Sequence, residues 1–382
     1  MPTDPTPFAD LPAALVEEIL QKTSAAGDLL VGTFQRLKAD RASCRQELID
    51  KGMILNDSSL GYPPLPTTCG TDGSYAIERL LSVDLTAAAA VAVEGLTPPS
   101  EKRHWEQPRH TSFVVPEVHH EGTATVLRAV MLGCELCLAA RAPHDLVMID
   151  MTLTLPVIYF NQALNQAPDS PSLLCSREFQ NNCGDYLEAF RTLLLAERSD
   201  KNYVGIPKYS TRREIGRVMG WAQEHDDRGL LTFLLKPGEF TRPMPLEQPD
   251  QKWHLNTGRA PEKIRDRLKG LAADIISNLE RIHVFYYKPH DWLPALRVEV
   301  AHNIATNNHR LAVVVQGLKH QCATPAMLEP YPLYLADRTV KALARSIPAF
   351  RHVTTQHISE RYDGDVGEVF FAMHGYRSES GA

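Results

Sequence analysis

One carboxylate interrupts the most strand-like segment of the chain, residues 146–155, which read LVMIDMTLTL. The apolar and β-branched residues on both sides of Asp150 are typical of a central strand that is buried on both faces. A carboxylate in such a strand loses its hydrating water, and this costs free energy unless a cation or a hydrogen-bond donor compensates. Asp150 is therefore predicted to hold a cation or to take part in catalysis, within a sheet that helices cover.

The rest of the chain alternates between strand and helix patterns without an internal repeat. Further strands are predicted at residues 87–93, 111–118, 203–206, 230–235, 282–287, 296–300 and 368–373. Helices are predicted at residues 123–140, 171–198, 211–219, 261–279, 304–318 and 333–344, with an exposed loop at 241–262. This alternation predicts an α/β chain with a mixed central sheet flanked by helices.

The first 60 residues have helical spacing of apolar side chains and end at the Pro-rich segment GYPPLPTT, residues 61–68. Proline and glycine end regular structure, so this segment marks a boundary. We predict an N-terminal helical region at residues 1–60, which provides dimer or partner contacts, and a second domain at residues 61–382.

Composition excludes several classes of protein. The net charge is −6, so any contact with nucleic acid must use a local patch or channel rather than bulk positive charge. The longest strongly apolar stretch that we identify, residues 85–93, is far shorter than the roughly 20 residues that span a bilayer. The N-terminal residues lack a signal-peptide pattern, and seven cysteines, an odd number, are typical of reduced cytosolic thiols. A cytoplasmic protein without membrane contact is expected.

Two other carboxylates stand at informative positions. Asp72 belongs to the sequence TDGS at the end of a short strand or in a turn, and Asp-Gly is also a common turn dipeptide. Glu135 is the only charge between Arg128 and Arg141 on an otherwise apolar helix. It either points toward the strand of Asp150 or lies on the solvent edge of its helix.

We predict that Asp72, Glu135 and Asp150 converge and share a metal ion, in a site of hard oxygen ligands. Such a site suits Mg²⁺ or Mn²⁺ better than Zn²⁺, because no cysteine or histidine accompanies the carboxylates. Two such ions can clamp a phosphodiester during hydrolysis. An aspartate on the first strand, a glutamate on a helix and an aspartate on a later strand follow the order of ribonuclease-H-like nucleases.

With these residues in place, the chain resembles the NurA nucleases over about residues 67–345. The matching segments are Asp72-Gly73-Ser74, Glu135, Val147–Asp150, VGIPK at 204–208, Asp227-Arg228, LLKPGE at 234–239, Arg297-Val298-Glu299, Pro330–Leu333 and Ala336-Asp337. The resemblance implies a ribonuclease-H-like core and a DNA nuclease that uses Mn²⁺ or Mg²⁺, with two ions. It also implies a homodimer whose channel receives DNA and a hexameric HerA-type ATPase as partner. The sequence has no P-loop motif, which fits a motor on a separate chain.

Two departures from the family pattern matter. Met151 follows Asp150 where glycine is frequent, so the close backbone approach that glycine allows is lost. The last motif has two registers. If Tyr331-Pro332 begins it, the final ligand position falls on Thr339; if Glu329-Pro330 begins it, the final acidic position falls on Asp337.

The second register matches more positions, so Asp337 is predicted as a fourth metal ligand, with Tyr331 near phosphate or water. The alternative is a surface ion pair between Asp337 and Lys341, one helical turn away. For DNA contacts we predict Ser74 and the basic cluster that follows a strand, Lys208, Arg212 and Arg213. The alternative for the basic cluster is a solvated helix start.

Three functions remain open from the sequence. The first is a metal-dependent DNA nuclease that acts with a translocase in end resection or in anti-phage defence. The second is a DNA-end-binding or assembly subunit whose site has decayed, which Met151 would favour. The third is a ribonuclease-H-type enzyme acting on RNA or hybrids, because a fold does not determine the sugar. The mode of cutting, exonuclease or endonuclease, and its polarity are also open.

Overall fold

The computed structural model describes residues 11–221 and 226–381, without the side chains of Leu37, Ala344 and residues 377–381. The chain divides into two compact units, residues 1–53 and 54–382. Residues 1–10 of the predicted N-terminal helical region lie outside the described residues. Residues 54–60, which the sequence assigned to that region, belong to the second unit.

The described part of the first unit is one long helix, α1 (Ala13–Asp50). It ends where Gly52 adopts a left-handed backbone with φ of 61°, a conformation that glycine allows without strain. Large apolar side chains along α1 are exposed, and Leu29, Leu30 and Phe34 are each more than half exposed. An exposed apolar stripe of this kind is typical of a surface that another protein covers.

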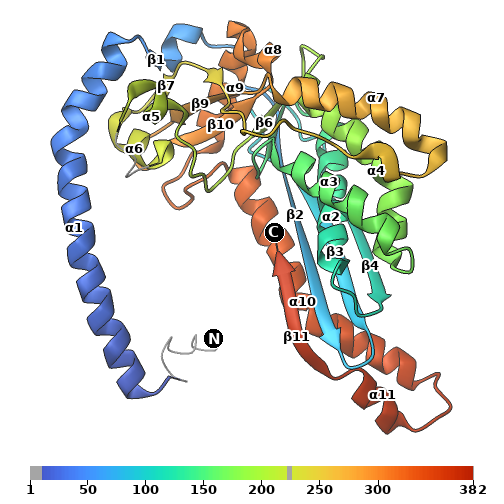
Figure 1. Cartoon of the computed structure of the whole chain (residues 1–382). Coiled ribbons are helices and arrows are strands. Elements are labelled where there is room, and N and C mark those ends of the chain that lie inside the picture. The colour runs from blue at the N-terminus through green and yellow to red at the C-terminus, as the bar shows by residue number, and fades with distance from the viewer. Residues whose placement is uncertain (1–10, 222–225, 382) are drawn as a thin grey trace. The chain divides into compact units, whose positions relative to one another are not determined.

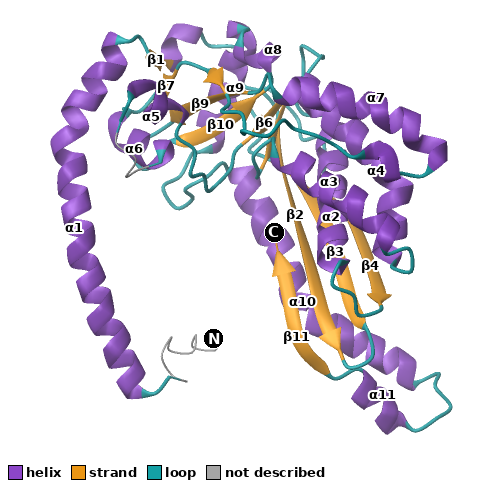
Figure 2. Cartoon of the chain, in the orientation of Figure 1, coloured by secondary structure: helices purple, strands orange, loops and turns teal. Residues whose placement is uncertain are grey.

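The second unit is built on one mixed sheet. Its described strands are β1 (Ile54–Asn56), β2 (Thr68–Leu80), β3 (Asp84–Glu94), β4 (Arg109–Glu117), β5 (Leu146–Ile149), β6 (Asn202–Gly205), β7 (Glu239–Thr241), β8 (Met244–Pro245), β9 (His283–Lys288), β10 (Leu296–Val300) and β11 (Gly375–Gly381). Its helices are α2 (Thr123–Arg141), α3 (Leu155–Gln166), α4 (Leu174–Leu195), α5 (Glu214–Met219), α6 (Asp227–Leu234), α7 (Glu262–Leu279), α8 (His302–Ala305), α9 (Asn308–Gln321), α10 (Tyr331–Ser359) and α11 (Val366–Ala372), with short 3₁₀ turns at 57–60, 167–169 and 257–259. Figure 2 shows these helices around the strands.

The strand order is β1-β7-β9-β10-β6-β5-β2-β3-β4, with β11 paired to β2 and β8 paired to β9. β2, β3 and β4 form an antiparallel meander, whereas β5 and β6 add in parallel to β2. This arrangement of β4-β3-β2-β5-β6 is that of a ribonuclease-H-like core, and it confirms the predicted α/β class with a mixed sheet.

Helices cover both faces of β2 and β3. α2 packs on one face, α10 packs on the other, and α4 and α7 form further layers outside α2 (Figure 1). Two glycines of β2 permit this approach, because successive strand residues point to opposite faces. A Cβ on Gly70 would lie 2.6 Å from the backbone of Pro332 at the start of α10, and one on Gly73 would lie 2.9 Å from Met131 of α2.

Two strand predictions are wrong. Residues 230–235 fall mostly in helix α6 and residues 368–373 mostly in helix α11. A short apolar run does not by itself distinguish a strand from a buried helix. Here the aspartate before each run caps the N-terminus of a helix. The Asp226 side chain accepts a hydrogen bond of 2.8 Å from the N–H of Gly229, and Asp365 accepts one of 2.8 Å from Gly367.

The central strand is also shorter than predicted. β5 ends at Ile149, so Asp150 follows the strand and residue 155 already begins α3. Asp72, conversely, does not lie in a turn but in the middle of the 13-residue strand β2. Both carboxylates are nevertheless at the sheet, as the sequence predicted.

The helix α2 is apolar and long enough, at 19 residues, to cross a bilayer by length and composition. Two charged residues, Arg128 and Glu135, interrupt this apolar run. In the structure α2 is mostly buried between the sheet and α4, as the core helix of a globular domain is.

Candidate metal centre

Parallel pairing of three strands fixes the positions of the candidate residues. β2 pairs with β5 so that Thr71 lies beside Ile149, and β5 pairs with β6 so that Ile149 lies beside Gly205. Asp72 is the next residue of β2, and Asp150 is the first residue after β5. The two aspartates therefore lie next to each other. Lys208 follows the end of β6 by three residues and lies at the same end of these strands.

Asp72, Asp150 and Asp337 form one group. Each offers a carboxylate oxygen, and these oxygens all lie within 4.8 Å of one another. Asp337 comes from the second turn of α10, on the face of the sheet opposite α2. The structure thus brings together two strand-associated aspartates and the late helical carboxylate that the second register of the last motif specifies.

Asp72 is 6% exposed and only partly satisfied. Its Oδ1 accepts a hydrogen bond of 2.8 Å from the N–H of Gly73, whereas its buried Oδ2 has no hydrogen-bond partner among the described residues. Burial, together with the charge of Asp150, raises the pKa of Asp72 to about 7. An unpaired buried oxygen that faces other carboxylates is costly, and a cation would satisfy it.

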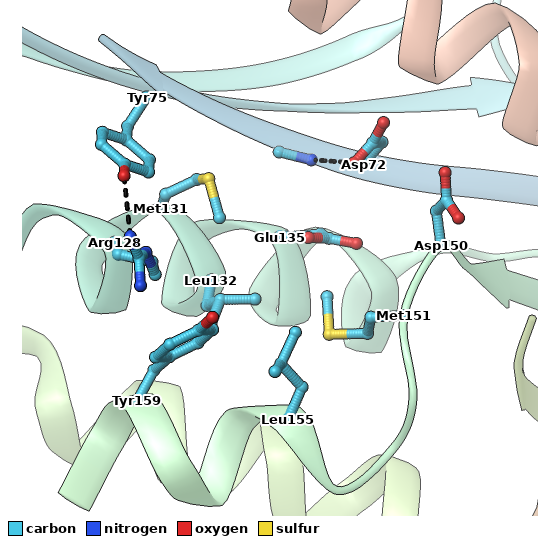
Figure 3. Close-up of a pocket in the computed structure, with 11 residues that line it drawn as sticks. Asp72, Tyr75, Arg128, Met131, Leu132, Glu135, Asp150, Met151, Leu155 and Tyr159 are labelled. Atoms are coloured by element: carbon cyan, nitrogen blue, oxygen red, sulfur yellow. Dashed lines mark hydrogen bonds between the residues drawn. The ribbon is translucent and has the colours of Figure 1, made fainter. Parts of the chain in front are cut away.

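Glu135 lies on the other face of β2, below the strand in Figure 3. Its side chain is 1% exposed, and its Oε1 accepts a hydrogen bond of 3.4 Å from Thr71. Burial and the charges of Asp72 and Asp150 raise its pKa well above the usual value. Glu135 therefore does not lie on the solvent edge of its helix, although its oxygens are not in the 4.8 Å group.

Lys208 links the group to Glu329. Its Nζ lies 2.7 Å from Asp150 Oδ2, 2.8 Å from Asp337 Oδ1 and 3.1 Å from Glu329 Oε2. Burial raises the pKa of Asp150 and of Glu329, while the ammonium of Lys208 opposes this rise. Burial alone would raise the pKa of Asp337 too, but hydrogen bonds from Lys208 and Lys341 lower it.

The two alternatives for Asp337 are both present in the structure. Asp337 pairs with Lys341 one turn away at 2.8 Å, and it also belongs to the carboxylate group. Glu329, the first residue of the second register, reaches the same lysine. Thr339 of the first register is exposed and donates its hydroxyl to the backbone oxygen of Leu335. Tyr331 is half-buried at the start of α10, and its predicted contact with phosphate or water stays a prediction.

A buried ionic network holds the loop that carries Asp150. The guanidinium of Arg297 on β10, 1% exposed, donates to Glu214 at 2.7 and 2.8 Å and to Glu299 at 3.0 Å. Glu299 in turn accepts hydrogen bonds from the Thr152 hydroxyl at 2.7 Å and from the N–H of Leu153 at 2.8 Å. The sequence marked Arg297 and Glu299 only as part of a motif, and the structure gives them this positioning role.

A cavity of about 210 Å³ extends from the carboxylates along α2 (Figure 3). Apolar side chains form its walls: Met131, Leu132, Met151 and Leu155. At its far end Arg128 donates a hydrogen bond of 2.9 Å to the Tyr75 hydroxyl and lies 4.8 Å from the ring centre of Tyr159. No sequence motif predicted this cavity. Its signal was the spacing of Arg128 and Glu135, because seven residues are two helical turns and place both on one face.

The remaining predicted DNA contacts are Ser74 in β2 and Arg212 and Arg213 in the loop before α5. Ser74 is 2% exposed within β2, which leaves little surface for a ligand. Arg213 donates a hydrogen bond of 2.9 Å to the backbone oxygen of Trp221 beside α5. Arg212 is half-buried in the same loop. Of the predicted basic residues, Lys208 alone contacts the carboxylate group in the described part of the chain.

The residues fit a divalent metal ion. Asp72, Asp150 and Asp337 would hold it, because they supply oxygen ligands from three directions and Asp72 Oδ2 otherwise remains unpaired. All-oxygen ligands favour Mg²⁺ or Mn²⁺. Glu135 is buried on the other face of β2, next to Gly73.

Known structures share this fold. The NurA nuclease from Sulfolobus solfataricus superposes with a TM-score of 0.58 at 12% sequence identity, covering 91% of this chain and 99% of that chain. A NurA structure with manganese gives a TM-score of 0.54 at 14% identity, covering 90% and 99%. NurA bound to dAMP and manganese gives 0.51 at 13% identity, covering 83% and 93%. The sequence itself matches no protein-family model and no curated protein. The chain therefore has the NurA fold, as the resemblance predicted.

Replacing Gly73 with alanine tests the packing of α2 against β2. The new Cβ would lie 2.9 Å from the Met131 side chain and 3.3 Å from Glu135 Oε2, so these side chains or α2 itself must shift. We expect a loss of about 1–3 kcal/mol in the free energy of unfolding, measured with urea. Gly270→Ala on exposed α7 is the control, because a Cβ there meets nothing within 4 Å and should be neutral or slightly stabilising. Equal stability of the two variants would contradict the close packing.

Replacing Glu299 with glutamine tests the buried network. Glutamine keeps the shape but removes the charge that pairs with Arg297 and accepts from Leu153. We expect a loss of about 1.5–3 kcal/mol in the free energy of unfolding, the range for hydrogen bonds to charged groups. The comparison variant Thr152→Val removes one hydrogen bond that Glu299 accepts but keeps the ion pair with Arg297, so it should cost less than Glu299→Gln. A glutamine variant no less stable than the valine variant would be inconsistent with this network.

Proposed function

We propose that this chain is a metal-dependent nuclease that hydrolyses phosphodiester bonds in DNA. The observation that carries the proposal is the convergence of Asp72, Asp150 and Asp337 around the unpaired Oδ2 of Asp72. The fold supports it, because structures with the same fold are NurA nucleases and some of them contain manganese. We extend the metal-binding property from those proteins to this one on the basis of the carboxylates described above.

Each residue of the centre has a distinct part in this proposal. A bound divalent ion supplies Lewis acidity, which lowers the pKa of an attacking water and stabilises the leaving oxygen. Asp72, Asp150 and Asp337 would hold the ion, or two ions, where β5 ends beside β2. Glu299 keeps the loop of Asp150 in place through Thr152 and Leu153. Lys208, at the same end of these strands, is suited to contact a phosphate oxygen as a point charge.

The cavity beside the carboxylates supports a nucleotide as the substrate unit. Its apolar walls suit the faces of a base, and Arg128 at the far end offers donors to base acceptors. One of the NurA crystal structures with this fold contains bound dAMP and manganese. We infer that the nucleotide next to the scissile phosphate occupies this cavity, with its phosphate toward Asp72 and Asp150.

The wider role follows the resemblance. We propose a homodimer in the cytoplasm that works with a HerA-like hexameric ATPase, because the sequence lacks a P-loop of its own. The exposed apolar side chains of α1 support a protein partner for that helix. End resection and anti-phage defence both remain compatible with such a complex. An assembly subunit with a decayed site, and an enzyme acting on RNA, are outcomes of the first test below.

Removing one carboxylate charge tests the centre. Asp150→Asn and Asp337→Asn keep the side-chain shape and delete a ligand charge. We expect each to reduce cleavage of labelled single-stranded or duplex DNA in Mn²⁺ by about 10²–10³-fold or more, the usual effect of losing one electrostatic group in an active site. The control Asp266→Asn changes an aspartate whose side chain is 96% exposed and should cleave normally.

The same assay separates the alternatives. RNA and RNA–DNA hybrid are included, each with Mn²⁺ or EDTA. Cleavage of RNA or hybrid in preference to DNA would favour the ribonuclease, and wild-type protein inactive on every substrate would favour the assembly subunit. Normal cleavage by Asp337→Asn, with unchanged melting, would return Asp337 to a surface ion pair with Lys341.

Charge placed on α1 tests the oligomer and the partner. In the double variant Leu30→Glu, Phe34→Glu two exposed apolar side chains of α1 become charged, which opposes burial in an interface. We expect light scattering at micromolar concentration to show a dimer for the wild type and a monomer for this variant. Co-sedimentation with a HerA-like hexamer should weaken as well. Gln35→Glu, also on α1, is the matched control, and a monomeric wild type would refute the dimer.

A further inference from the structure

The ammonium of Lys208 occupies a position that suits a cation. Its Nζ lies 2.7 Å from Asp150, 2.8 Å from Asp337 and 3.1 Å from Glu329, so three carboxylates surround one positive charge. Burial alone would lower the pKa of Lys208, but hydrogen bonds to Asp150 and Asp337 raise it above the usual value.

Two of these carboxylates are the same ones that would hold a metal ion. Asp150 and Asp337 belong to the group whose oxygens lie within 4.8 Å of one another, and both already pair with Lys208. A divalent cation bound by both would compete with the ammonium for the same negative charge. Like charges also repel strongly in a partly buried site.

We infer that Lys208 is an exchangeable counter-cation: its ammonium pairs with Asp150 and Asp337 when no ion is bound, and it separates from them when a divalent ion enters. This inference rests on the proposed metal centre and deepens it. The released ammonium would remain tethered beside the centre, where a phosphate can take the place of the lost carboxylates.

The local structure suits a side chain that moves on a fixed backbone. Arg228 donates hydrogen bonds to the backbone oxygens of Lys208 and Ala295, and Pro207 precedes Lys208 with a restricted φ. The side chain of Lys208 is nevertheless 38% exposed, so it has solvent to move into. A lysine carries its charge on a flexible four-carbon stem, unlike the rigid planar fork of arginine. Lys341, the other lysine on Asp337, contacts only that carboxylate of the group and does not bridge it.

Amine labelling of the wild-type protein tests the exchange directly. Acetylation of each lysine by an N-hydroxysuccinimide ester is followed by mass spectrometry, with and without MnCl₂, while calorimetry on the same sample measures Mn²⁺ binding. We expect Mn²⁺ to increase the labelling rate of Lys208 several-fold, because an amine released from its carboxylate partners is more accessible to the reagent. Lys319 is the internal control. It pairs with buried Asp57 at 2.8 Å, and its side chain is 37% exposed, nearly the same as for Lys208.

A second measurement uses the variant Lys208→Met, which keeps the length of the stem and removes the charge. We expect Mn²⁺ to bind about tenfold more tightly or better, because a like charge no longer competes for the carboxylates. Lys319→Met should bind Mn²⁺ as the wild type does. Melting of each variant by circular dichroism checks that it is folded.

The outcomes separate this inference from the proposed function. Mn²⁺ binding with unchanged or slower labelling of Lys208, or with no gain in affinity for Lys208→Met, would overturn the inference and leave the metal centre standing. Calorimetry that detects no Mn²⁺ binding by the wild type or by Lys208→Met would overturn both. Labelling of the wild type decides the question even where the methionine variant fails to fold.

Discussion

Mutual repulsion of buried carboxylates is the constraint on which the centre depends. Asp72, Asp150 and Asp337 lie together where β5 ends beside the middle of β2, with Glu135 buried behind them and Glu329 beside them. The protein tolerates this arrangement only because protons and lysine ammonium groups offset the charge. A site that is unfavourable without cations is by the same physics selective for them, since a divalent ion relieves more repulsion than any single side chain.

The framework places these groups with little freedom. Asp72 and Asp150 are neighbours because β2 and β5 are parallel and in a fixed register. Asp337 meets them because α10 begins against Gly70, where no side chain could be tolerated. Glu135 approaches from the opposite face because Gly73 leaves room for the side chains of Met131 and Glu135. Two glycines three residues apart in β2 thus allow carboxylates from both faces of the sheet to approach Asp72.

Much of this could be predicted from the sequence, and the failures have physical reasons. Asp150 in an apolar run and Glu135 alone on an apolar helix signalled buried charge, and both are buried or nearly so. The strand predictions at residues 230–235 and 368–373 are wrong because they rest on the apolar run alone. The aspartate that precedes each run caps a helix. The cavity with Arg128 and the pairing of Lys208 with Glu329 depend on contacts between distant segments, which no local pattern records.

The long strand β2 has a further consequence for how the chain reaches its native state. One edge pairs with β3, but the other is shared: β5 covers residues 68–71 and β11 covers residues 75–80. The segment that completes this edge, residues 375–381, follows almost three hundred residues later in the chain. Such distant pairing closes slowly, since a long loop must be ordered first. During synthesis the second half of β2 therefore presents unpaired backbone groups until the last strand emerges, and this is a period in which strand-to-strand association with other chains competes with folding.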